Sequence, residues 1–460
     1  MLFDIEHHFF NKFLNSKSDK TEWASVRATV LRSLAEVLQY SRSSISNESI
    51  KTKLSWKVLR ASYYSLLSIL RYTLSSERKH KVIFFSDVNN TSGPTDENFL
   101  FKEVISKSSN TQILIVSTFN QRTPNRENIE YLNIYLIRYF YYFIRVLGKI
   151  KSKFTVLPLS RKLILFLEKY NLENTHFSKL NEKIIISFYQ TTFLKFFLSK
   201  ILKIDCKNLK MFVFEDGFMS RYSKFIKYLN SKGIETIEYQ HGAIYSGHEA
   251  YNTHPKLISK IKLEKMIPSK FWLLGKNWIN YSNLCDQSFI IGVPWYQEVR
   301  KKFSHHKSSS RILIISDGID LSEYEDLSKN LVRSFKNNSN FNLESLSIQL
   351  RLHPSEKKFQ KSKNVLYSDI KNIWEDLRSS DIVIACVSTC LYQASFINKK
   401  PIIWLNGRAK FAYNAKYPFK TAENLSDLKE LIEEYYSCEV VEDSRNDNFF
   451  SPYGLNKILK

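Results

Sequence analysis

The chain has 460 residues, of which 43% are hydrophobic and 14% aromatic, and its formal net charge is +23 at pH 7. This length exceeds what a single hydrophobic core organises, and the composition excludes a disordered chain, so we expect more than one folded domain. The charge favours anionic partners, such as an acidic glycan, an anionic membrane or nucleic acid.

The N-terminal residues lack the basic start and apolar core of a signal peptide, and no apolar run reaches the roughly eighteen residues of a membrane span. The five cysteines form no CxxC pair and have no histidine at zinc-ligand spacing. These features predict a soluble or peripheral protein of the cytoplasm, with reduced thiols and no metal site. Apolar positions at helical spacing between residues 20 and 78 predict an N-terminal helical region over 1–80.

From Lys81 the pattern changes to short, continuous apolar runs separated by helices, which is typical of parallel strands covered on both faces. We therefore predict a Rossmann-like domain over 81–300. Its expected strands are 81–86, 111–119, 209–217, 234–242, 271–275 and 288–295.

The polar, basic stretch 298–310 is the expected linker, and the strand–helix alternation resumes after it. The sequence predicts a second Rossmann-like domain over 308–445, followed by a tail over 446–460. Its expected strands are 311–318, 345–356, 381–389 and 401–407, and its expected helices are 324–337, 370–379, 389–398 and 423–437. The predicted fold is α/β, with two doubly wound domains that face a central cleft.

Unusual residues follow several of the predicted strands. They are Glu215 and Asp216, Gln240 and His241, His353 and Pro354, and Ser388 and Thr389. Each pair alone is more often a turn or a helix cap. Parallel sheets bind ligands at the carboxyl ends of their strands, however, and all of these residues are expected at such ends.

The order of these pairs resembles bacterial glycosyltransferases of the GT-B fold that use CMP-activated acidic sugars. These are the sialyl- and polysialyltransferases and the capsule Kdo transferases. Their motifs are an acidic pair before a glycine, a His-Pro dipeptide and a Ser-Ser/Thr pair, which match Glu215-Asp216-Gly217, His353-Pro354 and Ser388-Thr389. The stretch EDGFMSR is also similar to the EDGF-x-R-S stretch of the Kdo transferases, with Arg and Ser transposed. The resemblance covers 211–404.

The resemblance implies an inverting, metal-independent transfer of a sialic acid or Kdo type of sugar from a CMP-sugar to a glycan or lipid-linked acceptor, without a cofactor. It implies that Asp216 or Glu215 is the base that takes the proton of the acceptor hydroxyl. It places the donor phosphate near His353, Pro354 and the Ser388-Thr389 pair. A positioned base activates a sugar hydroxyl, and a helix start stabilises the charge of a leaving phosphate.

Three further residues near the expected donor site complete the predicted nucleotide-sugar site. Ser316 and Gly318 follow the first strand of the second domain, and Arg351 precedes His353 on the same strand face. Arg351 is expected to add a cation. No DxD motif is present in the sequence.

His241 lies in a His-Gly turn after a predicted strand. It is similar to the turn that carries a proposed catalytic histidine in the CDP-glycerol polymerases of wall teichoic acid synthesis. An ordinary turn histidine accounts equally well for this pattern. The identity of the base therefore stays open between the carboxylate pair and His241.

The stretch 131–154 contains tyrosines, phenylalanines and cations but no acidic residue. This pattern suits a helix on an anionic membrane surface or a groove for an acidic glycan. The alternative is a buried helix whose cations reach outward. Nucleic acid is not expected, because no recognised binding module is present. The cations of this surface are Arg138, Arg145, Lys149, Lys151 and Lys153.

Three other functions remain alternatives to a glycosyltransferase at the inner face of the cytoplasmic membrane. A sugar-nucleotide 2-epimerase can share the architecture but needs no acceptor surface. A CDP-polyol phosphotransferase is favoured by His241 but not by the acidic and His-Pro motifs. A membrane-associated assembly factor could retain the fold without the chemistry.

Overall fold

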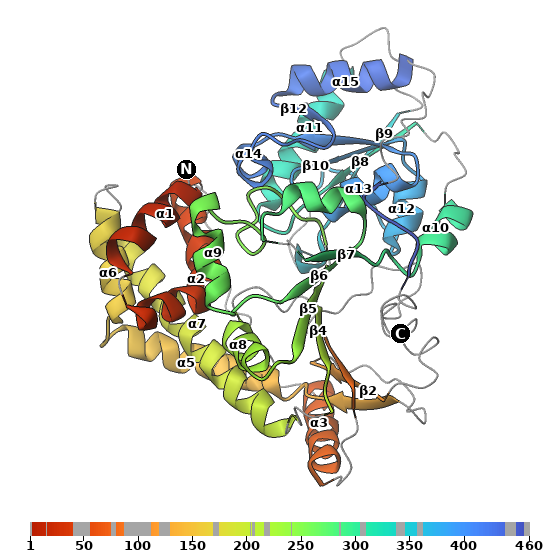
Figure 1. Ribbon diagram of the computed structural model, residues 1–460. Coiled ribbons are helices and arrows are strands. Elements are labelled where there is room, and N and C mark those ends of the chain that lie inside the picture. Colours follow the sequence, from red (N-terminus) through yellow and green to blue (C-terminus); the bar gives the residue numbers. More distant parts are fainter. Residues whose placement is uncertain are drawn as a thin grey trace.

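The structure is a computed structural model, and it describes the following residues: 2–14, 16–39, 56–74, 80–86, 112–118, 129–168, 174–202, 204, 208–215, 221–240, 242–284, 287–303, 310–336, 346–356, 362–437 and 448–454. They form two parallel sheets with helices on their faces (Figure 1).

The first sheet has seven parallel strands in the order β3-β2-β1-β4-β5-β6-β7. They are β1 (Val82–Ser86), β2 (Ile113–Ser117), β3 (Ile129–Asn133), β4 (Met211–Glu215), β5 (Glu235–Tyr239), β6 (Lys270–Leu273) and β7 (Ser288–Ile290). Every residue of β1 and β2 is buried, which explains their continuous apolar sequences. The direction of winding changes between β1 and β4, so a crevice is expected outside the carboxyl ends of these two strands.

The second sheet has five parallel strands in the order β12-β11-β10-β8-β9. They are β8 (Arg311–Ile315), β9 (Ser347–Arg351), β10 (Ile382–Ala385), β11 (Lys400–Trp404) and β12 (Lys420–Ala422). Here the winding changes between β8 and β10. The segments that follow these two strands are therefore the expected ligand-binding position in this domain.

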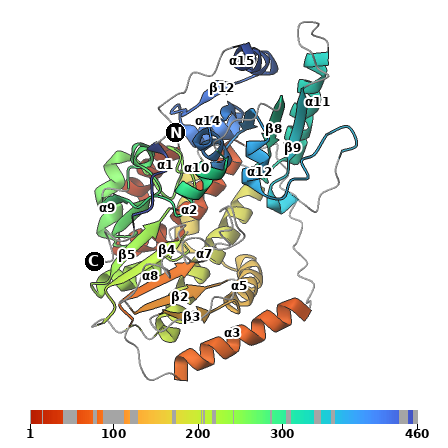
Figure 2. The ribbon, with the colours of Figure 1, turned by 90° about the vertical axis from the view of Figure 1, so that its right-hand side faces the viewer.

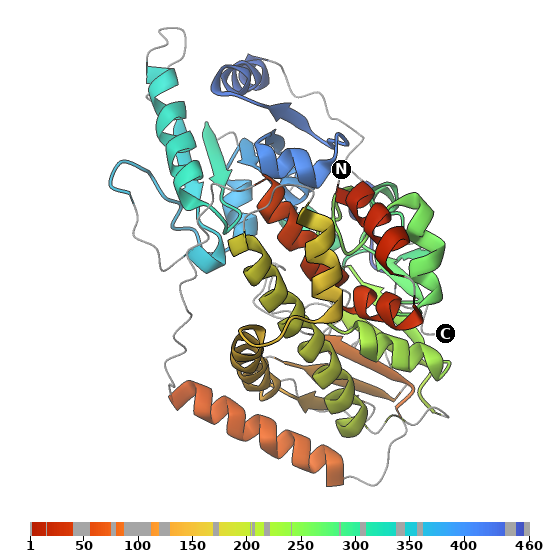
Figure 3. The same cartoon turned by 90° about the vertical axis from the view of Figure 1, so that its left-hand side faces the viewer.

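Several helices of the first domain form a layer beside its sheet. In Figure 3 this helical layer faces the viewer. They bury a cluster of their own, which includes Phe9, Trp23, Leu163 and Phe166. The helices of this layer are α1 (Leu2–Phe13), α2 (Lys17–Gln39), α6 (Pro158–Leu167) and α7 (Asn174–Ile201). The other helices of this domain are α3 (Trp56–Leu74), α5 (Ile137–Ser152), α8 (Ser223–Ser231) and α9 (Ile258–Leu263), with the short 3-10 helices η2 (Pro255–Leu257) and η3 (Lys276–Tyr281).

The second domain carries its helices around the smaller sheet (Figure 2). They are α11 (Leu321–Lys336), α12 (Ile373–Arg378), α13 (Thr389–Phe396), α14 (Gly407–Tyr413) and α15 (Leu425–Ser437), with the 3-10 turn η4 (Pro354–Glu356). Helix α10 (Tyr296–Phe303) precedes this sheet and packs beside α12.

A buried ion pair ties the N-terminal helices to the loop that follows β5. The Arg27 guanidinium, on α2, donates to the Glu6 carboxylate of α1 at 2.8 Å. It also donates to the carbonyl oxygens of Glu249 and, at 2.7 Å, of Asn252. Thr253 Oγ1 donates to the same Glu6 carboxylate at 3.0 Å. Helices α1 and α2 therefore fix the position of this loop.

The two domains share one continuous apolar core. Trp278 of the first domain and Tyr392 of the second are both buried, and their ring centroids lie 4.6 Å apart. The segment 448–454 returns from the second domain to the first, where Trp278 Nε1 donates to the Phe449 carbonyl at 2.6 Å. Ser451 N donates to Leu274 O at 2.8 Å, so this segment extends along the ends of β6 and β7.

Gly292 permits this close approach of the 448–454 segment. Its φ is +75°, and a Cβ atom there would lie 2.3 Å from the carbonyl oxygens of Ser451 and Pro452. A substitution would therefore both strain the backbone and displace the returning segment.

The observed architecture is the GT-B type, as the sequence predicts: two doubly wound parallel sheets on either side of one interface. Strands β3 and β12 were not expected. The predicted linker 298–310 is wrong over its first part, because α10 continues to Phe303. Tyr296, Val299 and Phe303 are buried at helical spacing and pack against the second domain.

Candidate functional site

The carboxyl ends of β1, β4 and β5 meet at one edge of the first sheet. Ser86 is in register with Glu215, and Glu215 is in register with Tyr239. Glu215 is thus the last residue of β4, in the centre of the edge that faces the second domain. Asp216, Gly217 and His241 lie outside the described residues, and their predicted roles stay predictions.

The turn after β5 is held firmly on both sides of position 241. Gln240 is buried; its Oε1 accepts from Leu274 N at 3.0 Å, and its Nε2 donates to Gly242 O at 2.7 Å. Ala243 N donates to Thr389 Oγ1 at 3.1 Å. The Thr389 hydroxyl, expected at the donor phosphate, therefore also joins the start of α13 to the turn predicted to carry the catalytic histidine.

The His-Pro dipeptide forms a tight turn at the carboxyl end of β9. The backbone N–H of His353 donates to Ser316 Oγ at 2.8 Å and to Glu356 Oε2 at 2.9 Å. Pro354–Glu356 then forms the 3-10 turn η4, so Glu356 caps its start three residues after His353. The His353 side chain is exposed at the surface of this edge.

Ser316, predicted at the nucleotide-sugar site, bonds to the turn of His353. Its hydroxyl contacts the Glu356 carboxylate and donates to Arg351 O at 3.1 Å, in addition to accepting from His353 N. These contacts hold the turn of His353. Ser316 is therefore a positioning residue for His353.

Arg351 was expected to supply a second cation to the nucleotide, but its guanidinium is engaged within the domain. It donates to Asp376, to Ile370 O at 2.6 Å and to Lys371 O at 2.9 Å. Asp376 is fully buried and also binds the Arg311 guanidinium at 2.6 Å. A buried carboxylate needs such partners, so Arg351 stabilises the fold of this edge.

The segment after β8 carries negative charge. Asp317 and Glu323 both pair with the buried Arg408 guanidinium, at 3.0 and 2.8 Å, and Asp320 accepts from Ser322 Oγ at 2.6 Å. Gly318 adopts a φ of +79° within this segment. Three carboxylates against one guanidinium disfavour an anion here, so the predicted phosphate contact of Gly318 gains no support from this geometry.

The start of α13 has the opposite character. Ser388 is its N-cap, with Oγ accepting from Cys390 N at 3.2 Å, and its first turn has no acidic residue. Free backbone N–H groups at a helix start favour an anion. The strands β10, β8 and β9 are neighbours in the parallel sheet, and their carboxyl ends lie at one edge. The start of α13 follows β10 and the His353 turn follows β9, so both lie at this edge. Of these two predicted phosphate contacts, the surrounding charge favours an anion at Ser388 over one at Gly318.

Two residues of this edge were missed from the sequence. Glu356 had a local signal, because the spacing H-P-S-E places a carboxylate where a capping box needs one. Arg408 had no local signal, since its partners Asp317 and Glu323 are distant in sequence. Both residues set the shape of the edge.

The two cysteines near this edge are free thiols. Burial raises the pKa of Cys386 to about 12 and also raises that of Cys390. Neither thiol is therefore a nucleophile at neutral pH. Cys206, Cys285 and Cys438 lie outside the described residues. Within the described ranges, no cluster of histidine, cysteine and carboxylate side chains could hold a metal ion.

The α5 surface is defined as the exposed face of α5 and the residues that follow it, from Phe140 to Phe154. The exposed fractions of Tyr142 and Phe143 are 57%, and that of Phe154 is 83%. Only Ile137, Ile144 and Gly148 of this helix are buried, which contradicts a buried core helix. Of the predicted cations, Arg138 is half-buried, and the exposed ones are Arg145, Lys149, Lys151 and Lys153. None of the helices described is long and apolar enough to cross a membrane.

We expect the protein to sediment with vesicles that contain anionic lipid and to be released at high salt. Exposed aromatic residues enter the interface, and each nearby cation contributes about 1 kcal/mol on an anionic surface. The measurement is co-sedimentation with anionic and with neutral vesicles. Phe143→Ser should weaken binding, whereas Ile319→Ser, which removes an exposed apolar side chain of the other domain, should not. Equal binding to both vesicle types would contradict the electrostatic part of this prediction.

No protein-family model matches this sequence, and no curated protein matches it at a significant level. Solved structures with a similar chain course include a variant of the wall teichoic acid polymerase TagF, with 12% identity over 86% of this chain and 93% of that one, and a TM-score of 0.40. A UDP-N-acetylglucosamine 2-epimerase from Methanocaldococcus jannaschii, in complex with UDP-GlcNAc and UDP, has 11% identity over 80% and 95% of the two chains and a TM-score of 0.41. A putative epimerase of the same kind from Listeria monocytogenes has 8% identity over 83% and 95%, and a TM-score of 0.43.

Proposed function

We propose that the protein is an inverting, metal-independent glycosyltransferase that moves a sugar of the sialic acid or Kdo type from a CMP-sugar to a glycan or lipid-linked acceptor in the synthesis of a bacterial surface polysaccharide. One observation carries this proposal: the Ala243–Thr389 contact joins the turn that carries His241 to the helix start expected to bind the donor phosphate. Acceptor activation and donor departure would then occur at one interface, at the cytoplasmic face of the membrane.

The first chemical step is activation of the acceptor. A carboxylate at the end of β4, Asp216 or Glu215, or the imidazole of His241, takes the proton of the acceptor hydroxyl. The hydroxyl oxygen forms a bond to the anomeric carbon of the donor sugar, on the face opposite CMP. Direct attack from that face inverts the configuration of this carbon.

The second part of the step is departure of CMP. The bond between the anomeric carbon and the phosphate oxygen breaks, and its electron pair stays with CMP. Negative charge therefore grows on the phosphate in the transition state. The His353 imidazole, the Ser388 hydroxyl and the backbone N–H groups at the start of α13 stabilise that charge.

CMP and CDP are expected to raise the melting temperature of the protein, and UDP and GDP are not. A ligand at about one hundred times its Kd adds about 2.7 kcal/mol to the free energy of unfolding. A thermal-shift panel of the four nucleotides measures this directly. Stabilisation by UDP alone would contradict the proposal and favour a 2-epimerase. Transfer of a phosphate to the product, detected by mass, would favour a CDP-polyol phosphotransferase.

The variant His353→Ala, measured in the same nucleotide panel as the unchanged protein, tests whether the imidazole contacts the donor phosphate. If the imidazole contacts the donor phosphate, CMP affinity should fall about tenfold to a hundredfold, since one charge-assisted hydrogen bond is worth about 1.5–3 kcal/mol. Lys329→Ala, which removes a half-buried lysine of α11 that pairs with Asp326, should leave CMP affinity unchanged. A lower melting temperature with unchanged CMP affinity would remove His353 from the donor site.

A further inference from the structure

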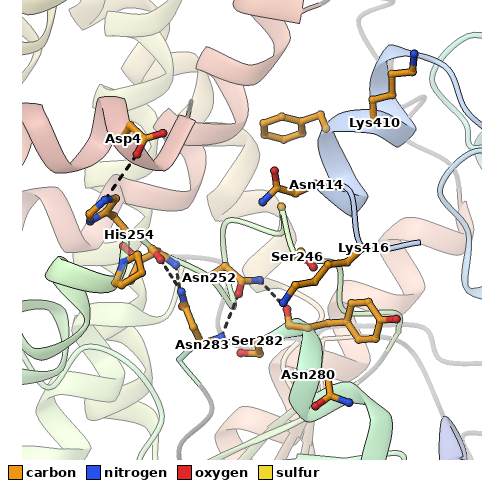
Figure 4. A pocket seen from close by; sticks show the side chains of 15 residues that line it. Asp4, Ser246, Asn252, His254, Asn280, Ser282, Asn283, Lys410, Asn414 and Lys416 are labelled. Atoms are coloured by element: carbon orange, nitrogen blue, oxygen red, sulfur yellow. Dashed lines mark hydrogen bonds and ion pairs between the residues drawn. The ribbon is translucent and has the colours of Figure 1, made fainter. Parts of the chain in front are cut away.

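A pocket of about 590 Å³ lies between the two domains, on the side where α1 approaches α14 (Figure 4). Four parts of the fold line it: the loop after β5 as far as Pro255, the end of η3 with the segment that follows it, α14 with the residues that follow it, and α1 through Asp4. The first two follow strands of the first sheet, and α14 follows β11 of the second. The pocket therefore opens at the same edges as the candidate catalytic site but is formed by different residues.

The wall from the first domain is rigid. Asn252 Oδ1 accepts from Asn283 N at 3.0 Å, and Asn283 Oδ1 accepts from Thr253 N at 3.0 Å. The same Asn252 amide donates to Tyr245 O and Tyr281 O, both at 2.9 Å. These bonds join the loop after β5 to the segment after η3, so the wall is formed before any ligand binds.

The opposite wall, formed by α14, contacts the loop after β5 through backbone atoms. Gly247 N donates to Ala412 O at 2.7 Å, and a Cβ atom on Gly247 would lie 2.3 Å from Phe411 O. Glycine at this position therefore lets α14 close one side of the pocket.

One buried hydroxyl in this pocket lacks a partner. Ser246 is 9% exposed, lines the pocket, and its Oγ has no hydrogen-bond partner among the residues that the structure describes. A buried polar group without a partner is costly, which favours a ligand atom that completes the bond.

The charges around the pocket favour an anion. Lys416 extends toward the first domain in Figure 4, while Lys410 pairs with Glu423 at 2.8 Å. The single carboxylate of the lining, Asp4, lies 3.6 Å from His254 Nε2. The other polar side chains of the lining are amides and hydroxyls, which bind the hydroxyl groups of sugars and polyols, and Phe411 and Pro255 add apolar surface.

We propose that this pocket binds a sugar or polyol that carries one anionic group, a carboxylate or a phosphate, with Ser246 and Lys416 as ligands. Its role as the subsite for the acceptor end rests on the proposed glycosyltransferase function. The binding itself does not, because the pocket, the unpartnered hydroxyl and the charge exist whatever the reaction.

The test measures binding without donor, by titration calorimetry on the full chain. The probes are N-acetylneuraminate and glycerol 3-phosphate, which distinguish the two kinds of anion, and the neutral N-acetylmannosamine and glycerol. At least one anionic probe should bind, more weakly at higher salt, and its neutral counterpart should bind at least tenfold more weakly. Lys416→Gln should weaken binding about threefold to tenfold, since an exposed charge is screened. Ser246→Ala should weaken it about fivefold.

The control variant is Lys429→Gln, which removes a half-buried lysine of α15 outside the pocket lining and should leave binding unchanged. Melting temperatures of all variants identify any loss of folding. Binding of neither anionic probe, or binding that Lys416→Gln and Ser246→Ala leave unchanged in folded protein, overturns the proposal. Anion binding that depends on these residues, in a protein that binds no CMP, would support the pocket and reject the glycosyltransferase.

Discussion

Replacing Asp216 with asparagine is expected to lower turnover by roughly 10²–10⁴-fold and to leave CMP affinity nearly unchanged. Asparagine keeps the size and much of the hydrogen bonding of the side chain but cannot accept the proton of the acceptor hydroxyl, and general-base catalysis contributes an effect of this size. The measurements are steady-state turnover with a CMP-sugar and CMP affinity on the same preparation.

Glu215→Gln and His241→Ala are the companion variants. Adjacent residues of a strand point to opposite faces, so only one carboxylate of the pair should serve the cleft. We favour Asp216, because it lies nearer the glycine. Near-normal turnover of Asp216→Asn, together with loss of activity in Glu215→Gln or His241→Ala, would assign the base to the other residue.

Arg27→Met should lower the free energy of unfolding by about 3–5 kcal/mol. The substitution leaves the buried Glu6 carboxylate without its cation, and uncompensated buried charges have costs of this size. It also removes the donor to the carbonyls of Glu249 and Asn252. Chemical denaturation monitored by tryptophan fluorescence measures the change.

The double variant Glu6→Gln with Arg27→Met is the control for this prediction. It removes the unpaired carboxylate, so it should recover part of the lost stability relative to Arg27→Met alone. Lys420→Met, which breaks a pair with Glu434 that is exposed on both sides, should cost far less. A double variant no more stable than Arg27→Met would contradict the ion-pair explanation.

The sheets could be predicted from the sequence because their strands are buried on both faces. Runs such as 82–86 and 113–117 are continuously apolar, and this signal is local. Strand β3 has the mixed sequence IEYLN and is followed by a turn into α5, so it gave no such signal. Helix α10 did carry a signal, since Tyr296, Val299 and Phe303 have helical spacing, but its basic residues obscured it.

Residues of the candidate site could be predicted only where a polar or ionisable side chain comes directly at or after the end of a strand. That rule placed Glu215, His353 and Ser388 at strand ends and helix starts, where they are found. It could not assign roles that depend on distant partners. Arg351 pairs with Asp376 and Ser316 with Glu356, and nothing in the local sequence distinguishes these contacts from contacts to a nucleotide. The periodic pattern of apolar residues predicts helices and strands, but it does not predict which side chains form contacts between distant parts of the sequence.

The returning segment 448–454 has a consequence for how the chain assembles during synthesis. Its hydrogen bonds to the first domain lie on residues 274–293, yet the ribosome makes it only after the whole second domain. At about 5–20 residues per second, the first domain exists for roughly 8–30 s before this segment is available. Throughout that interval the indole N–H of Trp278 and the backbone groups of Leu274, Ile291 and Val293 lack their final partners. The interdomain edge is thus the last part of the nascent protein to mature, and an arrested chain would present it to chaperones.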